Sequence, residues 1–198
     1  MSDSVRESVI TVILAALLTF TGCVSQGDVG FESETGGVSK PTWGDQDFTS
    51  SSQKTWMDYR IRDISTGRVF RISDLDGEIV LVESFAVWCP TCKRQQDEIH
   101  NLVGEYGGRV ASVGLDTDPN EDAEKLSEYV ERNNYGGLYA ISPPELTQRL
   151  IDEYGLSVLN APGAPVIMVC RGKGVSTRIL DRGLKTVDKL RVEVEKGC

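Results

Sequence analysis

The pattern of apolar and polar residues divides this chain of 198 residues into three regions. A weakly polar to apolar stretch, VITVILAALLTF, occupies residues 9–20. From Val24 to about Gln53 the chain is rich in Ser, Gly, Asp, Glu and Thr and has few apolar residues. Short apolar runs and amphipathic stretches then alternate to the end of the chain, so we expect the folded part to begin near Trp56.

Seven stretches of the folded region have the pattern of strands. Residues 59–64 and 68–72 alternate polar and apolar side chains around the turn Ser65-Thr66-Gly67, which predicts a β-hairpin. The turn Arg171-Gly172-Lys173-Gly174 predicts a second hairpin, whose returning strand is residues 175–180. Apolar runs predict the other strands at residues 79–85, 109–115, 138–141 and 166–170.

Four further stretches repeat apolar residues at the spacing of an amphipathic helix. Gly107-Gly108 and Gly155 stop two of them, because glycine readily ends a helix. The expected helices are residues 90–106, 118–132, 145–154 and 184–196. This order of elements predicts an α/β domain, in which a central sheet with both βαβ and hairpin connections is covered by helices on both faces.

Composition narrows the class of protein. The chain is 39% hydrophobic and 26% charged, as is usual for a soluble globular domain. Its net charge is −9 and its basic residues do not cluster, which argues against nucleic acid as a partner.

The N-terminal apolar stretch has the length of a signal-peptide core and is too short to span a bilayer comfortably. Thr21-Gly22-Cys23 follows it and resembles the lipobox of prokaryotic lipoproteins, in which Cys23 is lipidated after cleavage behind Gly22. Phe20 stands where that pattern usually has Leu, and an uncleaved short anchor is the alternative. We therefore expect a signal peptide at residues 1–22, a flexible tether at 23–55 and one domain at 56–198.

Cys89-Pro90-Thr91-Cys92 directly follows an apolar run and precedes residues that favour a helix. Two thiols three residues apart on a helical turn share one face and can meet. Cys89 would cap the helix, where the dipole and the free N–H groups favour a thiolate. Pro90 suits the first helical position because it has no N–H to lose. A strand followed by such a dithiol predicts disulfide exchange.

The alternatives for this motif are a zinc site and a purely structural disulfide. Structural zinc needs further Cys or His ligands at matching spacing, and the remaining candidates are isolated. They are Cys23, Cys170, Cys198 and the single histidine, His100. We expect no metal and no cofactor, Cys170 as a small buried hydrophobe, Cys198 as a free or intermolecular thiol, and His100 at the surface.

Four acidic residues gather before the second expected helix. They are Asp116, Asp118, Glu121 and Asp122. A hard cation is one conceivable ligand for them. We interpret them instead as the usual bias of negative charge toward a helix N-terminus.

Three stretches of the domain resemble thioredoxin-fold proteins, and most closely the extracytoplasmic TlpA-like and ResA/CcmG-like thiol–disulfide oxidoreductases. These are the hairpin ending in residues 73–77 (SDLDG), residues 82–92 (VESFAVWCPTC), and Gly163-Ala164-Pro165-Val166 ahead of a hairpin. The resemblance covers residues 56–196. It implies a thioredoxin-like fold with a central mixed β-sheet flanked by helices and an N-terminal β-hairpin extension.

The resemblance also implies roles for individual residues. Cys89 would be the exposed nucleophile, and the more enclosed Cys92 would resolve the mixed disulfide. Trp88 would contribute to the docking surface together with Pro90 and Thr91, although Trp88 could instead simply pack over the helix mouth.

Ala164-Pro165 occupies the place of the family's cis-proline. Proline has no N–H, but Ala164 keeps both its N–H and its C=O. The resemblance implies that these two groups pair with an extended segment of the substrate.

Glu83 is a carboxylate in an otherwise apolar strand, six residues before Cys89. Burying it is costly unless it is paired or protonated. In thioredoxins an acid at this spacing lies beneath the dithiol, so Glu83 is expected to act as general base for Cys92 with a pKa raised by burial. The alternative is an exposed strand residue, or one paired with Lys93 or another cation.

The sequence therefore predicts a membrane-tethered, extracytoplasmic thiol–disulfide oxidoreductase acting on protein cysteines. Its C-P-T-C loop resembles that of reductases serving cytochrome c maturation, and a thiol protein would supply its electrons. The alternatives are a disulfide oxidase or isomerase, and a metallochaperone that binds Cu(I) through the dithiol.

Overall fold

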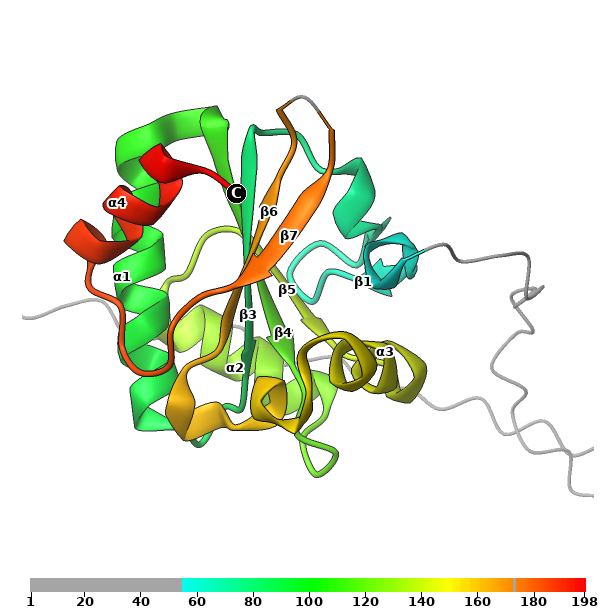
Figure 1. Ribbon diagram of the computed structural model, residues 1–198. Coiled ribbons are helices and arrows are strands. Elements are labelled where there is room, and N and C mark those ends of the chain that lie inside the picture. Colours follow the sequence, from blue (N-terminus) through cyan, green and yellow to red (C-terminus); the bar gives the residue numbers. More distant parts are fainter. Residues whose placement is uncertain (1–54, 173) are drawn as a thin grey trace, which may run out of the picture. The chain divides into compact units, whose positions relative to one another are not determined.

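The computed structural model describes residues 55–172 and 174–198 (Figure 1). The predicted signal peptide and Cys23, and nearly all of the predicted tether, lie outside these residues and remain predictions. No helix in the described part of the chain combines the length and the apolar character needed to cross a bilayer.

The described region folds around a five-stranded sheet with the order β5-β4-β3-β6-β7, and β1 and β2 form a separate two-stranded sheet. The strands are β1 (Ile61–Arg62), β2 (Val69–Phe70), β3 (Ile79–Phe85), β4 (Val110–Asp116), β5 (Leu138–Ile141), β6 (Val166–Cys170) and β7 (Ser176–Ile179). The helices are α1 (Pro90–Tyr106), α2 (Ala123–Asn133), α3 (Pro144–Tyr154) and α4 (Val187–Lys196). The predicted α/β fold with a mixed sheet and an N-terminal hairpin is confirmed.

Strand β3 is the centre of the sheet. It runs parallel to β4 and antiparallel to β6, so that Glu83 lies opposite Gly114 on one side and Val166 on the other. β4 and β5 are also parallel, whereas β6 and β7 are antiparallel. The carboxyl ends of β3, β4 and β5 therefore share one edge of the sheet, and β3 leads into α1 at that edge.

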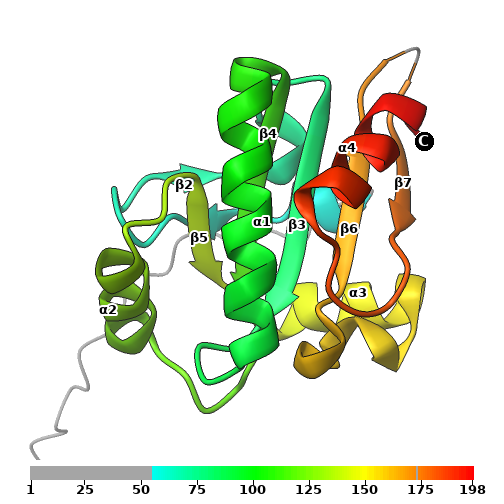
Figure 2. The same ribbon diagram turned by 90° about the vertical axis from the view of Figure 1, so that its left-hand side faces the viewer.

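The two faces of β3 belong to different layers. Val80 and Val82 are buried in a cluster that includes residues of α3, whereas Ile79 and Leu81 are buried against α1 and α4. Figure 2 shows α1, α2 and α4 in front of the sheet and α3 behind it. Because successive side chains of a strand point to opposite faces, Glu83 belongs to the face covered by α1.

Two predicted helix starts were wrong. α2 begins at Ala123 rather than at residue 118, because the side chain of Asp118 accepts the N–H of Asn120 at 2.9 Å and holds a turn there. Asp122 is the true cap and accepts the N–H of Lys125 at 2.9 Å. α4 begins at Val187 rather than at residue 184, because the preceding loop turns inward to bury the side chain of Lys185.

Cys170 is buried in an apolar cluster as expected, but the expectation for Cys198 was wrong. The two residues form a disulfide across a sequence separation of 28. α4 packs on the α1 side of the sheet and carries the C-terminus to β6, which contains Cys170. A free or intermolecular thiol at Cys198 was therefore an incorrect prediction.

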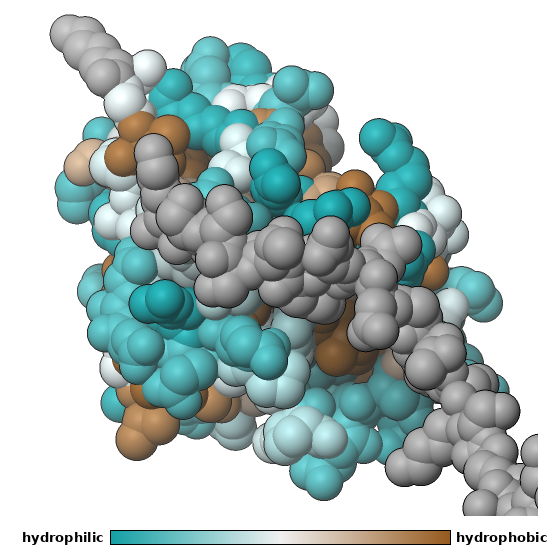
Figure 3. Space-filling view, turned by 90° about the vertical axis from the view of Figure 1, so that its right-hand side faces the viewer, coloured by the Kyte–Doolittle hydropathy of each residue, from teal (hydrophilic) through white to brown (hydrophobic). Residues whose placement is uncertain are grey.

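Exposed apolar side chains come from separate elements. The large ones are Val69, Trp88, Leu156, Val175 and Val192. On the face shown in Figure 3, the atoms not drawn in grey are mostly hydrophilic, and hydrophobic residues form small groups among them. Among these exposed residues, Trp88 is the one beside the dithiol.

Candidate active site

The dithiol lies at the edge of the sheet where β3 ends and α1 begins. Both Cys89 and Cys92 are free thiols. Cys89 is the N-cap of α1, and its sulfur accepts the backbone N–H of Cys92 at 3.1 Å. The thiol of Cys92 donates to the carbonyl of Ala161 at 3.0 Å. The Cys89 sulfur therefore contacts the first turn of α1, which carries Cys92.

Both thiols are covered. Cys89 is 1% exposed and Cys92 is fully buried, so the expectation of an exposed Cys89 was wrong. The reason is that the Cys89 sulfur points to the N–H groups of its own helix and joins a cluster with Phe85 and Leu126. Reaction with a disulfide therefore requires a local displacement of the residues around Cys89.

The environment of Cys92 opposes its ionisation. Burial raises the pKa of Cys92 far above that of a free thiol, and its hydrogen bond with Cys89 and the nearby charge of Glu83 raise this pKa further. Cys92 is therefore a neutral thiol at physiological pH. It can become a nucleophile only when another group takes its proton.

Glu83 is the nearest buried acid. It is 1% exposed, and among the described residues neither of its carboxylate oxygens has a hydrogen-bond partner. Burial raises the pKa of Glu83 well above its usual value; the charge of Lys185 opposes this rise, and a thiolate at Cys89 adds to it. The alternative of an exposed or Lys93-paired Glu83 is wrong, because Lys93 binds Asp97 at 3.0 Å.

A small cavity adjoins Glu83 and has a volume of about 10 Å³, the size of one water molecule. Gln96 of α1 also lines it, and within the described structure the amide Nε2 of Gln96 has no partner. Tyr129 donates to Oε1 of the same amide at 3.0 Å and so fixes its orientation. The exposed His100 lines the cavity as well, which places one wall close to solvent.

Gly114 makes room for this arrangement. A Cβ on Gly114 would lie 2.4 Å from Cε1 of Tyr139, a distance that real contacts do not show. The ring of Tyr139 therefore rests on the backbone of β4 directly beside Glu83, and Tyr139 is a further wall of the cavity.

Lys185 is a buried cation that the sequence did not reveal. Its ammonium donates to the carbonyls of Ala164 at 2.7 Å, Gly183 at 2.6 Å and Asp181 at 3.0 Å. Burial lowers the pKa of Lys185 to about 8, although the charge of Glu83 acts in the opposite direction. No local pattern could have identified it, because only the fold brings the loop before α4 next to residue 164.

The loop at Ala164-Pro165 contacts the dithiol through Ala161, whose carbonyl accepts from Cys92. Ala164 adopts a left-handed conformation with φ of 43° and is buried. Its N–H donates to Ala161 at 2.8 Å, and its carbonyl accepts from Lys185. Both groups that were expected to pair with substrate are thus bonded internally, and a substrate strand would have to replace these bonds.

The acidic residues after β4 hold the loop that carries Cys89. Glu121 accepts the backbone N–H of Val87 at 2.7 Å, and Asp118 accepts the indole N–H of Trp88 at 2.6 Å. Trp88 is nevertheless 59% exposed, so it is available as a docking residue and its indole is tethered by Asp118. We expected these acids to reflect only the preference for negative charge at a helix N-terminus. That holds for Asp122, but the prediction missed the hydrogen bonds of Glu121 and Asp118 to the loop that carries Cys89.

Asp116 completes that acidic group. It is buried, and in the described chain its Oδ2 atom has no partner. Burial and the neighbouring carboxylates of Glu121 and Asp118 raise the pKa of Asp116 to about 7. Within the described residues, no group of three or more His, Cys, Asp or Glu side chains is arranged to hold a metal ion.

Comparison with known proteins shows which proteins this chain resembles. A family model described as thioredoxin matches residues 70–129, which include β3, the dithiol and α1. The thioredoxin-like protein YneN of Bacillus subtilis is 26% identical over 137 residues, covering 69% of this chain and 73% of that protein. The chain thus contains a region that matches the thioredoxin family and is similar to thioredoxin-like proteins.

Solved structures share the fold at low sequence identity. A secreted Mycobacterium tuberculosis disulfide oxidoreductase homologous to Escherichia coli DsbE has a TM-score of 0.52 and 16% identity, covering 72% of this chain and 98% of that one. The exposed lipoprotein thioredoxin Etrx1 of Streptococcus pneumoniae has a TM-score of 0.55 and 13% identity, with coverage of 70% and 98%. A thioredoxin-family thiol:disulfide interchange protein of Chlorobium tepidum has a TM-score of 0.56 and 16% identity, with coverage of 70% and 91%.

In this thioredoxin-like domain the site can carry out two-electron exchange between dithiol and disulfide. It contains the groups that such an exchange needs: a helix-capping thiol, a second thiol one turn further and a buried carboxyl group on the adjacent strand.

Proposed function

We propose that this thioredoxin-like protein is a membrane-tethered, extracytoplasmic oxidoreductase that reduces disulfides in proteins. The observation that carries the proposal is the position of Cys89 at the start of α1, with the neutral thiol of Cys92 one turn further and buried Glu83 on the adjoining strand.

The exchange proceeds in two steps. The Cys89 thiolate attacks one sulfur of the substrate disulfide; a Cys89–substrate bond forms, and the other substrate sulfur leaves as a thiolate and takes a proton. Glu83 then accepts the Cys92 proton. The Cys92 thiolate attacks the Cys89 sulfur, which closes the intramolecular disulfide and releases the second substrate thiol. A thiol protein then returns two electrons and two protons to the dithiol.

The electrostatics of the site favour reduction as the direction. A dithiol is a strong oxidant when its surroundings stabilise the reduced, ionised form. Here burial and the charge of Glu83 disfavour a thiolate at Cys92, and a thiolate at Cys89 raises the pKa of Glu83. These interactions destabilise the ionised, reduced dithiol and so lower its reduction potential. A low potential supports a reductase over an oxidase or isomerase.

The proposed location rests on the N-terminal sequence. The apolar stretch ending in Thr21-Gly22-Cys23 favours export and lipidation of Cys23, and the polar stretch after it gives the domain reach from the membrane. Two structurally similar proteins are named as secreted and as an exposed lipoprotein, which is consistent with such a location.

The reduction potential of the full chain tests the direction. We expect a value near that of thioredoxin, about −270 mV, in titration against dithiol buffers with thiol alkylation as the readout. A value near about −120 mV, as for the oxidant DsbA, would contradict the reductase assignment. Loss of insulin reduction on Cys89→Ser, with full activity in Cys198→Ser, would assign the activity to the dithiol.

A further inference from the structure

A second cysteine pair lies at the opposite end of strand β3 from the dithiol. Cys170 is in register with Ile79, the first residue of β3, and is bonded to Cys198. Cys89 follows the last residue of the same strand. Seven strand residues span about 20 Å, so the two pairs cannot exchange electrons within one molecule. The disulfide therefore needs a thiol from outside if it reacts at all.

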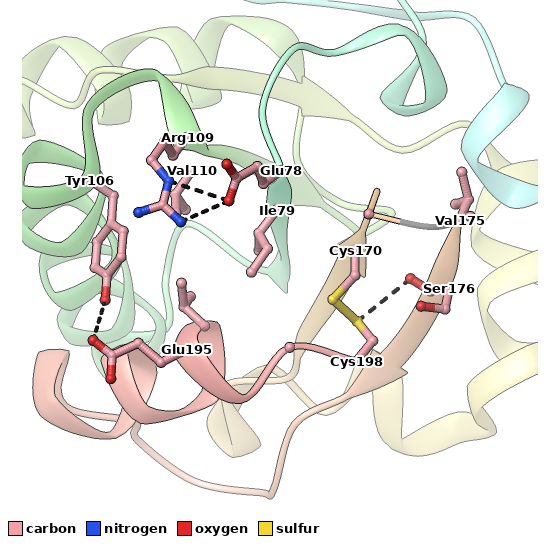
Figure 4. Close-up of a pocket in the computed structure, with 14 residues that line it drawn as sticks. Glu78, Ile79, Tyr106, Arg109, Val110, Cys170, Val175, Ser176, Glu195 and Cys198 are labelled. Carbon is pink, nitrogen blue, oxygen red and sulfur yellow. Dashed lines mark hydrogen bonds and ion pairs between the residues drawn. A yellow bond between two sulfur atoms is a disulfide. The ribbon is translucent and has the colours of Figure 1, made fainter.

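The disulfide borders a hollow of about 730 Å³. Figure 4 shows it between Arg109 and Glu78 on one side and the β6–β7 hairpin on the other. Ile79 and Val110 give the hollow apolar lining, whereas the Arg109–Glu78 ion pair, at 2.8 Å, lies at its rim. Sites for small molecules usually have volumes of about 300–1,000 Å³, so the hollow is large enough for a low-molecular-weight thiol.

The two sulfurs differ in access. Cys170 is 9% exposed and lies in the ladder between β3 and β7, whereas Cys198 is exposed. The Cys198 sulfur is 3.7 Å from the carbonyl oxygen of Ser176 at the edge of the hollow. Although both cysteines line the hollow, Cys198 is therefore the more accessible target for an incoming thiolate.

The end of α4 is anchored independently of the disulfide. Arg178 of β7 donates to the carbonyl of Gly197 at 3.3 Å and to that of Glu193 at 3.3 Å, and it forms an ion pair with the Glu193 carboxylate. Val194 is buried in the same cluster as Cys170. Opening the disulfide leaves these contacts intact, so the two sulfurs stay close together and the bond can form again.

We propose that Cys170–Cys198 is a second thiol–disulfide exchange site, which takes low-molecular-weight thiols from the hollow at Cys198. The thiolate attacks the Cys198 sulfur; a bond between the thiol and Cys198 forms, the Cys170–Cys198 bond breaks, and the Cys170 sulfur leaves as a thiolate and takes a proton. A second thiol molecule then attacks the adduct, leaving Cys198 as a thiol and releasing the oxidised disulfide of the small thiol. Two thiols are thus oxidised for each protein disulfide reduced.

The test uses the full chain with the substitutions Cys89→Ser and Cys92→Ser, so that the result does not depend on the proposed function of the dithiol. The oxidised protein is incubated with glutathione, quenched with an alkylating agent and mapped by peptide mass spectrometry, which reads Cys23 separately. We expect a glutathione adduct on Cys198 and alkylated Cys170, with an unchanged far-UV circular dichroism spectrum. An adduct on Cys170, or opening only under conditions that unfold the protein, would overturn the proposal.

Two matched variants test the hollow itself. Val175→Trp places a large side chain at its lining, whereas Val192→Trp makes the same change at an exposed valine of α4 that does not line it. We expect Val175→Trp to slow the opening by glutathione severalfold and Val192→Trp to leave the rate unchanged. Equal rates in both variants would refute the hollow as the entry site. Faster opening by the reduced wild-type chain than by glutathione, at equal thiol concentration, would refute the assignment to small thiols.

Discussion

The two ends of strand β3 carry two cysteine pairs in opposite states. At the carboxyl end, Cys89 and Cys92 are three residues apart, reduced and buried. At the amino end, Cys170 and Cys198 are 28 residues apart, oxidised and partly exposed. The charged groups near the two pairs also differ. Near the first pair, Glu83 is buried and has no hydrogen-bond partner in the described structure. Beside the second pair, Glu78 is paired with Arg109. The difference between the two ends is therefore electrostatic: the pKa of Glu83 is raised because its carboxyl group is buried, whereas the ion pair at the other end is exposed.

Removing one thiol of the buried pair should have the largest effect. We expect Cys89→Ser to abolish turnover and Cys92→Ser to accumulate a mixed disulfide with substrate, because only Cys92 can resolve it. Non-reducing electrophoresis with mass spectrometry of the adduct measures this. An adduct on Cys92 in the Cys89→Ser protein, and none in Cys92→Ser, would reverse the two roles.

Breaking the other pair should change stability rather than activity. Cys198→Ser removes a cross-link over 28 residues, which is expected to lower the free energy of unfolding by about 3 kcal/mol. Urea denaturation of the oxidised proteins measures the change, and insulin reduction should stay at the wild-type rate. A loss of activity at a temperature where the variant is folded would show that the two ends of β3 are coupled.

Glu83→Gln should keep the fold and slow release of the mixed disulfide near neutral pH by about 10²-fold, because an amide cannot take the Cys92 proton. The loss should shrink at high pH, where Cys92 ionises without help. Single-turnover reduction measured across pH for both proteins gives the result. Superimposable profiles would mean that Glu83 is structural and that water or the substrate carries the proton.

Asp116 should affect only the pH dependence of stability, because its folded-state pKa of about 7 lies above its usual value of 3.8. The folded protein keeps a proton that the unfolded chain releases, so the stabilisation is complete below about pH 4 and is lost as pH rises toward 7. Asp116→Asn should therefore flatten the fall in the free energy of unfolding between these pH values.

The control for Asp116 is Asp122→Asn. Asp122 is the exposed cap of α2, and Asn is an equally good helix cap, so this variant should keep the wild-type pH dependence. If Asp116→Asn and the wild type show the same slope, the pKa of Asp116 is not raised in the folded protein.

Local sequence patterns are enough to predict strand β3, helix α1 and the placement of both thiols on one helical turn. These features depend on neighbours in the chain: a continuous apolar run makes a doubly covered strand, Pro90 and Cys89 suit the start of a helix, and a three-residue spacing places both thiols on one turn. The same run favoured a buried Glu83 but left an exposed strand residue as the alternative, and the structure shows that Glu83 is buried.

Three features depend on long-range packing: the Cys170–Cys198 bond, the burial of Lys185 against Ala164, and the hydrogen bond from the Val87 N–H to Glu121. Packing also covers Cys89, which was expected to be exposed. Each of these contacts joins segments that are far apart in the chain, or depends on what packs above a local motif. Their formation is set by how the sheet and helices bury apolar surface together, and no local pattern of residues encodes that outcome.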